Sequence, residues 1–242
     1  MSPALANDTE GLGLSNNGNS GVLGLSFPQI ASIPSTAGQT ILQNLFSSFG
    51  DQDRYFAFSL GRNQSQNSSS SSASSTISSF TIGQLDPALA NDTNGFQFTT
   101  VVSAGPNNYD YWKIPLHGIT INSLNLPLSK SLVPGAKTPI AVLDTGTTLI
   151  LGPSPDVATF WAAVGGPETV RKNPQTNSWE VQCNRAVIVK FNLGDKNDAK
   201  EYAVHPGDIS WEEGKSDGNW CMGGIQANDG ASKCIYALKL MV

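Results

Sequence analysis

An aspartate on a glycine turn between two apolar runs constrains this chain more than any other feature of its sequence. The turn reads Asp144-Thr145-Gly146-Thr147-Thr148, and residues 140–143 and 149–151 are entirely apolar. Short apolar runs that end at a turn are typical of buried β-strands. Because a carboxylate is costly to hold beside buried strands, a fold that retains one there often uses it chemically. The pattern predicts a strand, a tight turn and a second strand, with Asp144 as a candidate functional residue.

The rest of the chain has the pattern of a mostly-β protein. Its 242 residues include 24 glycines and 14 prolines, and turn residues separate many short apolar segments. Strands are expected over residues 21–28, 55–60, 79–83, 96–102, 112–121, 139–143 and 187–191. Apolar spacing predicts one helix at residues 40–46 and another at 155–164, with Ser154 as the cap of the second and Gly165 at its end.

The charge and the hydropathy of the chain argue against two classes of partner, nucleic acids and membranes. The net charge is −5, and no basic run interleaved with aromatic residues occurs, so no nucleic-acid surface is expected. No apolar run reaches the roughly 18 residues of a membrane helix, so no membrane partner is expected either.

Residues 1–4 lack both the basic start and the apolar core of a signal peptide. Four N-glycosylation sequons, which begin at Asn7, Asn63, Asn67 and Asn91, nevertheless favour secretion modestly.

The cysteines do not predict a metal site. Cys183, Cys221 and Cys234 have no Cys-x-x-Cys spacing and no histidine nearby. In a secreted protein an odd number of cysteines leaves one thiol unpaired. We therefore expect no metal ion.

Four features occur in one order along the chain: Val22-Leu23-Gly24, residues 111–116 with Ile119, residues 144–148, and the pair Cys183 and Cys221. Together they make the chain resemble a pepsin-like aspartic endopeptidase of the fungal type, peptidase family A1. Val22-Leu23-Gly24 resembles the strand that supports the first active-site loop. Residues 111–116 with Ile119 resemble the early strand of the C-terminal lobe. Residues 144–148 match the second active-site loop, and Leu151-Gly152-Pro153 continues it as the family does. Cys183 and Cys221 lie where the family has its C-lobe disulfide.

The resemblance implies an incomplete pepsin-like bilobal acid protease fold, mostly β, that holds the end of the N-terminal lobe and most of the C-terminal lobe. Residues 1–94 are expected to be the N-lobe remnant with interlobe strands and a Ser-rich loop at 63–79. Residues 95–232 are expected to form the C-terminal lobe. Residues 233–242 form a tail that does not match the family, so the supporting strand of this lobe is expected to be absent.

The resemblance also implies a mechanism and a role for each loop residue. In this family two aspartates share one proton and activate a water that attacks a peptide carbonyl. Asp144 would be one of the pair, and the Thr147 hydroxyl would steady its outer oxygen. Thr145 would tie the two loops together, while Gly146 and Thr148 would line the substrate cleft. The same resemblance implies polypeptide substrates, no metal or organic cofactor, a secreted or vacuolar location and a monomeric state.

One departure leaves alternatives open, because the family uses two Asp-Thr-Gly loops and this sequence contains one. The chain is therefore expected to be a fragment truncated at both ends and inactive by itself. It could instead be a non-catalytic protease-like binding protein, or a homodimer that pairs two copies of Asp144. From the turn alone, Asp144 could also be a structural aspartate bonded to neighbouring amides, or the nucleophile of a phosphoryl transfer.

Overall fold

A computed structural model describes residues 21–31, 38–61, 78–87, 96–131, 133, 135–211, 218–229 and 235–238, the last of these as backbone only. The contacts divide the chain into two compact units, Met1–Asn94 and Gly95–Val242. All four sequons, nearly all of the Ser-rich segment and Cys234 lie outside the described residues. Each unit is described separately.

The described part of the first unit consists of a short helix and a pair of strands. Helix α1 (Ile41–Phe46) begins at a capping box, in which the Thr40 hydroxyl accepts from Gln43 N and the Gln43 side chain accepts from Thr40 N. Strands β1 (Phe56–Ser59) and β2 (Ser79–Ile82) pair in antiparallel fashion. The helix at 40–46 and these two strands confirm the sequence predictions.

The strand predicted over residues 21–28 is wrong. The described residues before Pro28 have no strand, and Pro28–Ile30 forms a 3-10 turn, η3. Proline fixes its own φ and has no N–H to donate to a ladder, which favours a turn at this point. Val22 and Leu23 are mostly exposed, so the apolar run does not enter the core of its unit. A second 3-10 turn, η4, spans Asp51–Asp53.

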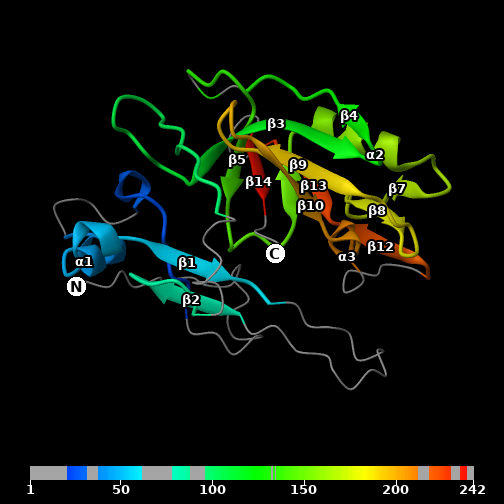
Figure 1. The fold of residues 1–242 in the computed structure, drawn as a ribbon. Helices are drawn as coiled ribbons and strands as arrows, with labels where there is room; N and C mark the ends of the chain where they lie inside the picture. The colour runs from blue at the N-terminus through cyan, green and yellow to red at the C-terminus, as the bar shows by residue number, and fades with distance from the viewer. Residues whose placement is uncertain are drawn as a thin grey trace. The chain divides into compact units, whose positions relative to one another are not determined.

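The described strands of the second unit form one large sheet and one small sheet (Figure 1). The large sheet is eight-stranded, in the order β10-β9-β3-β5-β14-β6-β13, with β4 paired to β3. Its strands are β3 (Lys113–Ile121), β4 (Leu124–Leu126), β5 (Ile140–Leu143), β6 (Ile150–Gly152), β9 (Val189–Leu193), β10 (Lys200–Val204), β13 (Ile225–Ala227) and β14 (Ile235–Leu238).

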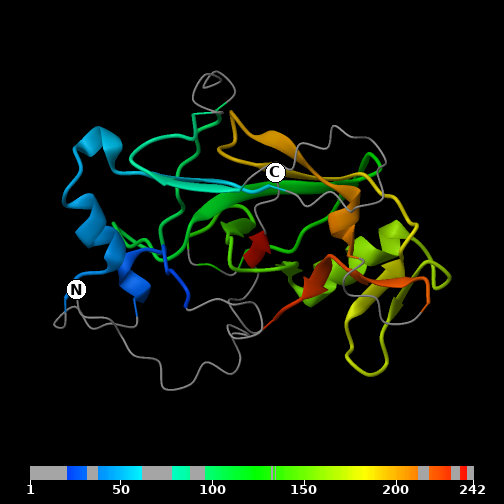
Figure 2. The ribbon, with the colours of Figure 1, turned by 90° about the horizontal axis from the view of Figure 1, so that it is seen from below.

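The small sheet lies at one end of this unit, together with the longest helix (Figure 2). Its four strands have the order β11-β12-β8-β7. The bounds are β7 (Val170–Lys172), β8 (Trp179–Gln182), β11 (Ser210–Trp211) and β12 (Trp220–Gly223). Helix α2 (Ser154–Val164) contacts β13, and the short α3 (Pro206–Ile209) leads directly into β11.

Trp161 is the centre of the core at this end. Its side chain is completely buried, and its ring N–H donates to Ile225 O at 2.9 Å. Val157, Phe160 and Val164 bury the same face of α2 at helical spacing. Burial of one aromatic side chain of this size stabilises the fold by roughly 2–3 kcal/mol. The helix is thereby fixed against β13.

Two predictions for this unit are wrong in detail. Residues 96–102 form no strand, because isolated bonds rather than a ladder hold them: Val102 N donates to Lys113 O, and Thr100 donates to the Asp195 carboxylate. Ser154 does not cap α2, since Pro153 is the N-cap residue and Ser154 is already helical. The helix itself, and strands at 112–121, 139–143 and 187–191, are present with slightly different ends.

Strand β14 lies in the middle of the large sheet, between the strands that flank the Asp144 loop. It pairs in parallel with β5, from Ile235 opposite Ile140 to Leu238 opposite Leu143. It also pairs in antiparallel fashion with β6 through Ala237 and Leu151. This finding corrects the expectation that the lobe lacks a strand in this place.

The structure contains the expected disulfide between Cys183 and Cys221, whose Cα atoms are 5.0 Å apart. The bond joins the residue after β8 to β12, and 38 residues separate the two cysteines. By the chain-entropy estimate, a loop of this length stabilises the native state by roughly 3–4 kcal/mol.

Removal of this disulfide is expected to lower the free energy of unfolding by roughly 3–4 kcal/mol. Urea unfolding of the Cys183→Ala/Cys221→Ala double variant measures the loss. Cys234→Ala is the matched control, since it removes a thiol that is not part of the disulfide. Equal effects of the double variant and the control would contradict the prediction.

Candidate active site

The Asp144 loop connects β5 to β6. Both strands are anchored in the core: Ile140 and Ala141 are buried in β5, as is Ile150 in β6. Leu149 alone separates Thr148 from β6. The loop is therefore held at both ends by buried strands, as its sequence pattern predicts.

Each carboxylate oxygen of Asp144 accepts a hydrogen bond from within the loop. Gly146 N donates to Oδ1 at 2.8 Å, and the Thr147 hydroxyl donates to Oδ2. The side chain of Asp144 is half-buried. Two donors on different oxygens fix both the position and the rotation of the carboxylate plane.

Glycine is required at position 146 by close approach. A Cβ built on Gly146 would lie 3.2 Å from Asp144 Oδ1, a distance tighter than most real Cβ contacts. The carboxylate would have to move away from the Gly146 N–H that orients it. Thr145, Gly146 and Thr148 are exposed, so this side of the loop is accessible. The roles of Thr145 and Thr148 stay predictions.

Neither histidine belongs to this loop. His117 Nε2 lies 2.8 Å from Gly194 O, and His205 Nδ1 accepts from Gly207 N at the start of α3. Both contacts are structural. Among the residues described, no group of three or more His, Cys, Asp or Glu side chains is arranged to hold a metal ion.

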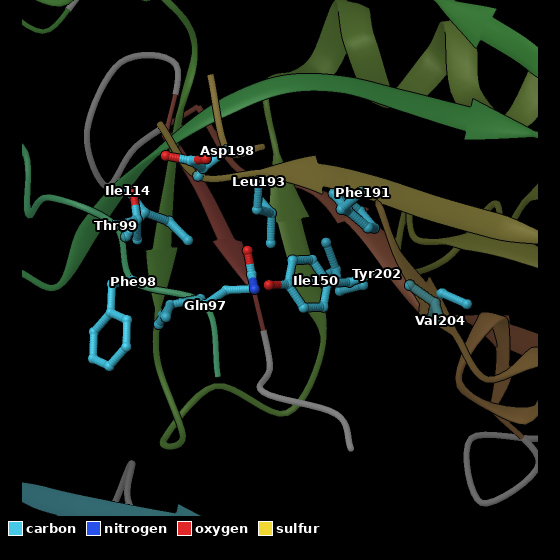
Figure 3. A pocket seen from close by; sticks show the side chains of 13 residues that line it. Gln97, Phe98, Thr99, Ile114, Ile150, Phe191, Leu193, Asp198, Tyr202 and Val204 are labelled. Carbon is cyan, nitrogen blue, oxygen red and sulfur yellow. The ribbon is translucent and has the colours of Figure 1, made fainter. Parts of the chain in front are cut away.

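Sequence reasoning missed an apolar cavity of about 270 Å³ in the second unit (Figure 3). Its walls come from residues 97–99, from β3, β5, β6, β9 and β10, and from the β9–β10 turn. Leu143 and Ile150, at the two ends of the Asp144 loop, contribute to it. No sequence signal reveals this cavity, because its walls come together only in the folded sheet.

Sequence reasoning also missed the contact of Ser154 with Asp229. Ser154 N and Ser154 Oγ donate to the two oxygens of the Asp229 carboxylate, across 75 residues of sequence. The only sequence signals were a serine at the start of a helix and an aspartate in a turn, and neither indicates the partner.

Comparison with known proteins identifies the class to which this fold and loop belong. The family model for eukaryotic aspartyl proteases matches residues 4–237, which is nearly the whole sequence. The chain therefore belongs to the eukaryotic aspartyl protease family. The match extends into the tail beyond residue 232 and includes most of β14.

Individual relatives agree with the family match. The chain is 24% identical over 216 residues to major aspartyl peptidase 1 of Cryptococcus neoformans var. grubii, covering 88% of this chain and 41% of that protein. It is 23% identical to chymosin of Camelus dromedarius, covering 86% and 45%. It is also 23% identical to an aspartic protease of Phaffia rhodozyma, covering 90% and 49%. The chain thus spans less than half the length of these relatives.

The described helices include none with the length and apolar character that a membrane crossing requires.

Proposed function

We propose that Asp144 is one of the two catalytic aspartates of a pepsin-like endopeptidase. The observation that carries the proposal is the pair of hydrogen bonds from Gly146 N and Thr147 Oγ1 to different oxygens of Asp144. In a member of the aspartyl protease family, this arrangement presents an oriented carboxylate on an accessible loop.

The chemistry requires a second carboxylate close to Asp144. Two carboxyl groups that share one proton titrate as a unit, so one can take a proton from water while the other donates to the developing oxyanion. The single Asp-Thr-Gly sequence of this chain supplies one of them. In our proposal Thr147 keeps the Asp144 carboxylate in plane, Thr145 joins the two loops, and Gly146 and Thr148 face the substrate.

The proposed substrates are polypeptides with bulky apolar residues around the cleaved bond, and no cofactor takes part. The names of the relatives, aspartyl peptidase, chymosin and aspartic protease, support polypeptides as the substrates. The mechanism needs one ionised and one protonated carboxyl group at the same time, and such pairs titrate at acid pH. A secreted or vacuolar location fits this requirement.

The test measures cleavage of a denatured protein by the purified 242-residue chain at about pH 3–5, with and without pepstatin. We expect a monomer in light scattering and no pepstatin-sensitive cleavage, since one aspartate has no partner. Pepstatin-sensitive cleavage by a dimer would support pairing of two Asp144 residues instead. The same cleavage by a monomer would overturn the proposal that the chain needs a second aspartate from elsewhere.

A sequence determination of the transcript on both sides of the coding region tests the origin of the second aspartate. We expect a further Asp-Thr-Gly upstream of Met1. If the transcript encodes none and the chain is monomeric and inactive, the protein is a non-catalytic relative. In that case Asp144→Asn would leave its ligand binding unchanged.

A further inference from the structure

Asp229 makes a two-point contact with a residue that lies far from it in the sequence. Its carboxylate accepts from Ser154 N at 2.9 Å and from Ser154 Oγ at 2.5 Å. Ser154 is the first residue of α2, and its N-cap, Pro153, makes no side-chain cap hydrogen bond. Asp229 thus accepts from the N–H of the first residue of α2, one of the four donors at a helix start that have no partner within the helix.

The contact continues a row of backbone pairs along β6. Ile150 N donates to Gly224 O at 2.9 Å, and Asn228 N donates to Gly152 O at 2.8 Å. Between these bonds, β6 and β13 pair in parallel over three residues each. Hydrogen bonds therefore join the segment 224–229 to the segment 150–154 along its length, and the contact of Asp229 with Ser154 is the last in this row.

This row begins two residues after the Asp144 loop ends. Thr148 is followed by Leu149 and then by Ile150, whose N–H makes the first bond of the row. A shift of β6 along its axis would pull directly on Thr147, which donates to Asp144. The position of β6 therefore decides whether Thr147 reaches the carboxylate.

We propose that Asp229 is a positioning residue of the Asp144 loop: its two-point contact with Ser154 locks β6 and the start of α2 in the register that places Thr147 on Asp144. Asp229 touches neither the substrate nor the reacting atoms in this proposal. The role in catalysis rests on the proposed function, whereas the lock itself is a structural property that is measured without substrate.

The surroundings of Asp229 favour the charged form of its carboxyl group, which the contact with Ser154 requires. The Ser154 hydroxyl, and next the Ser154 backbone N–H, lower the pKa of Asp229 below its ordinary value of 3.8, against a small opposing effect of desolvation. The negative charge also lies at the positive end of the α2 dipole. The other charged group in the first turn of α2 is Asp156, which accepts from Ser129, while β6 and β13 carry no titratable side chain.

The direction of the pH dependence follows from this shift. Because the pKa of Asp229 is lower in the folded chain than in the unfolded chain, its stabilisation is complete above the ordinary value. The stabilisation is lost only as the pH falls through the lower, folded value. The Asp229 carboxylate therefore stays charged to a lower pH than an ordinary aspartate does.

The test compares Asp229→Asn and Ser154→Ala with the unsubstituted chain. Hydrogen–deuterium exchange is followed in peptides that cover 144–154, and unfolding midpoints are measured from about pH 2 to pH 7. Near neutral pH we expect Ser154→Ala to raise exchange in these peptides roughly tenfold, and the double variant to add little further. Asp229→Asn should raise exchange by less, because the asparagine can still accept from Ser154 N and loses only the negative charge. The difference in midpoint between Asp229→Asn and the unsubstituted chain should vanish at the lowest pH.

Glu168→Gln is the matched control, because it makes the same carboxyl-to-amide change at an exposed position just beyond the other end of α2. It should leave exchange in 144–154 unchanged. The lock is overturned if Asp229→Asn behaves like this control, or if its effect persists undiminished at the lowest pH. These outcomes leave the protease proposal untouched, and absence of peptidase activity leaves the lock untouched.

Discussion

Replacement of Asp144 by asparagine is expected to reduce peptide cleavage roughly 10⁴-fold, the upper end of the range for a group that moves a proton in the transition state. The change keeps the size of the side chain. The asparagine oxygen can still accept from Gly146 N, and the Thr147 hydroxyl can accept from the new amide. The fold should therefore persist, while the shared proton of the carboxyl pair is lost.

The measurement uses a preparation that shows pepstatin-sensitive cleavage, which in our proposal is the longer protein encoded by the transcript. The ratio kcat/KM is compared between Asp144→Asn and the unsubstituted protein across the acid range. Glu168→Gln is the control for a carboxyl-to-amide change at an exposed site in the same unit. Retention of more than about a tenth of the activity by Asp144→Asn would exclude Asp144 from the proton transfer.

Replacement of Gly224 by alanine is expected to destabilise the second unit by more than about 4 kcal/mol, which lies in the exceptional range for one substitution. A Cβ at this position would overlap the backbone carbonyl oxygen of Asp208 and lie 2.7 Å from the Asp208 carbonyl carbon. Backbone atoms cannot rotate away as a side chain does. Gly224 N also donates to Ile209 O at 2.8 Å, so separation of the two segments breaks a ladder bond.

Urea unfolding, followed by tryptophan fluorescence, measures this effect. Trp161 and Trp179 lie in the same core, so their emission reports directly on the second unit. Gly118→Ala in β3 is the control, because a Cβ there meets no atom within 4 Å. The control should change the free energy of unfolding by only about 1 kcal/mol. Similar losses for both variants would contradict the steric explanation.

Local patterns in the sequence were sufficient to predict the elements that carry the site. The runs on either side of residues 144–148 became β5 and β6, since buried apolar runs next to a glycine turn have few other solutions. Helix α2 was predicted for the same reason, from its apolar spacing and the glycines that end it. Its first residue was assigned wrongly, because Pro153 takes the cap position.

Features that depend on distant segments were not predictable from the pattern. Residues 96–102 have the composition of a strand, but they are held by Asp195 and Lys113 rather than by a ladder. The Ser154–Asp229 contact could not be predicted from the sequence, because no local pattern indicates which of the many aspartates bonds to a given serine. The place of residues 235–238 in the sheet is likewise decided by the gap between β5 and β6.

The place of β14 has a consequence for the order of events during synthesis. The two strands that present the Asp144 loop are made before β14, and this strand between them is not available until residue 238 has left the ribosome. Long-range pairing of this kind forms slowly, since a large loop must close first. A nascent chain therefore carries Asp144 on an incomplete sheet. The sheet order thus delays assembly of the support for this loop until residues 235–238 have been synthesised.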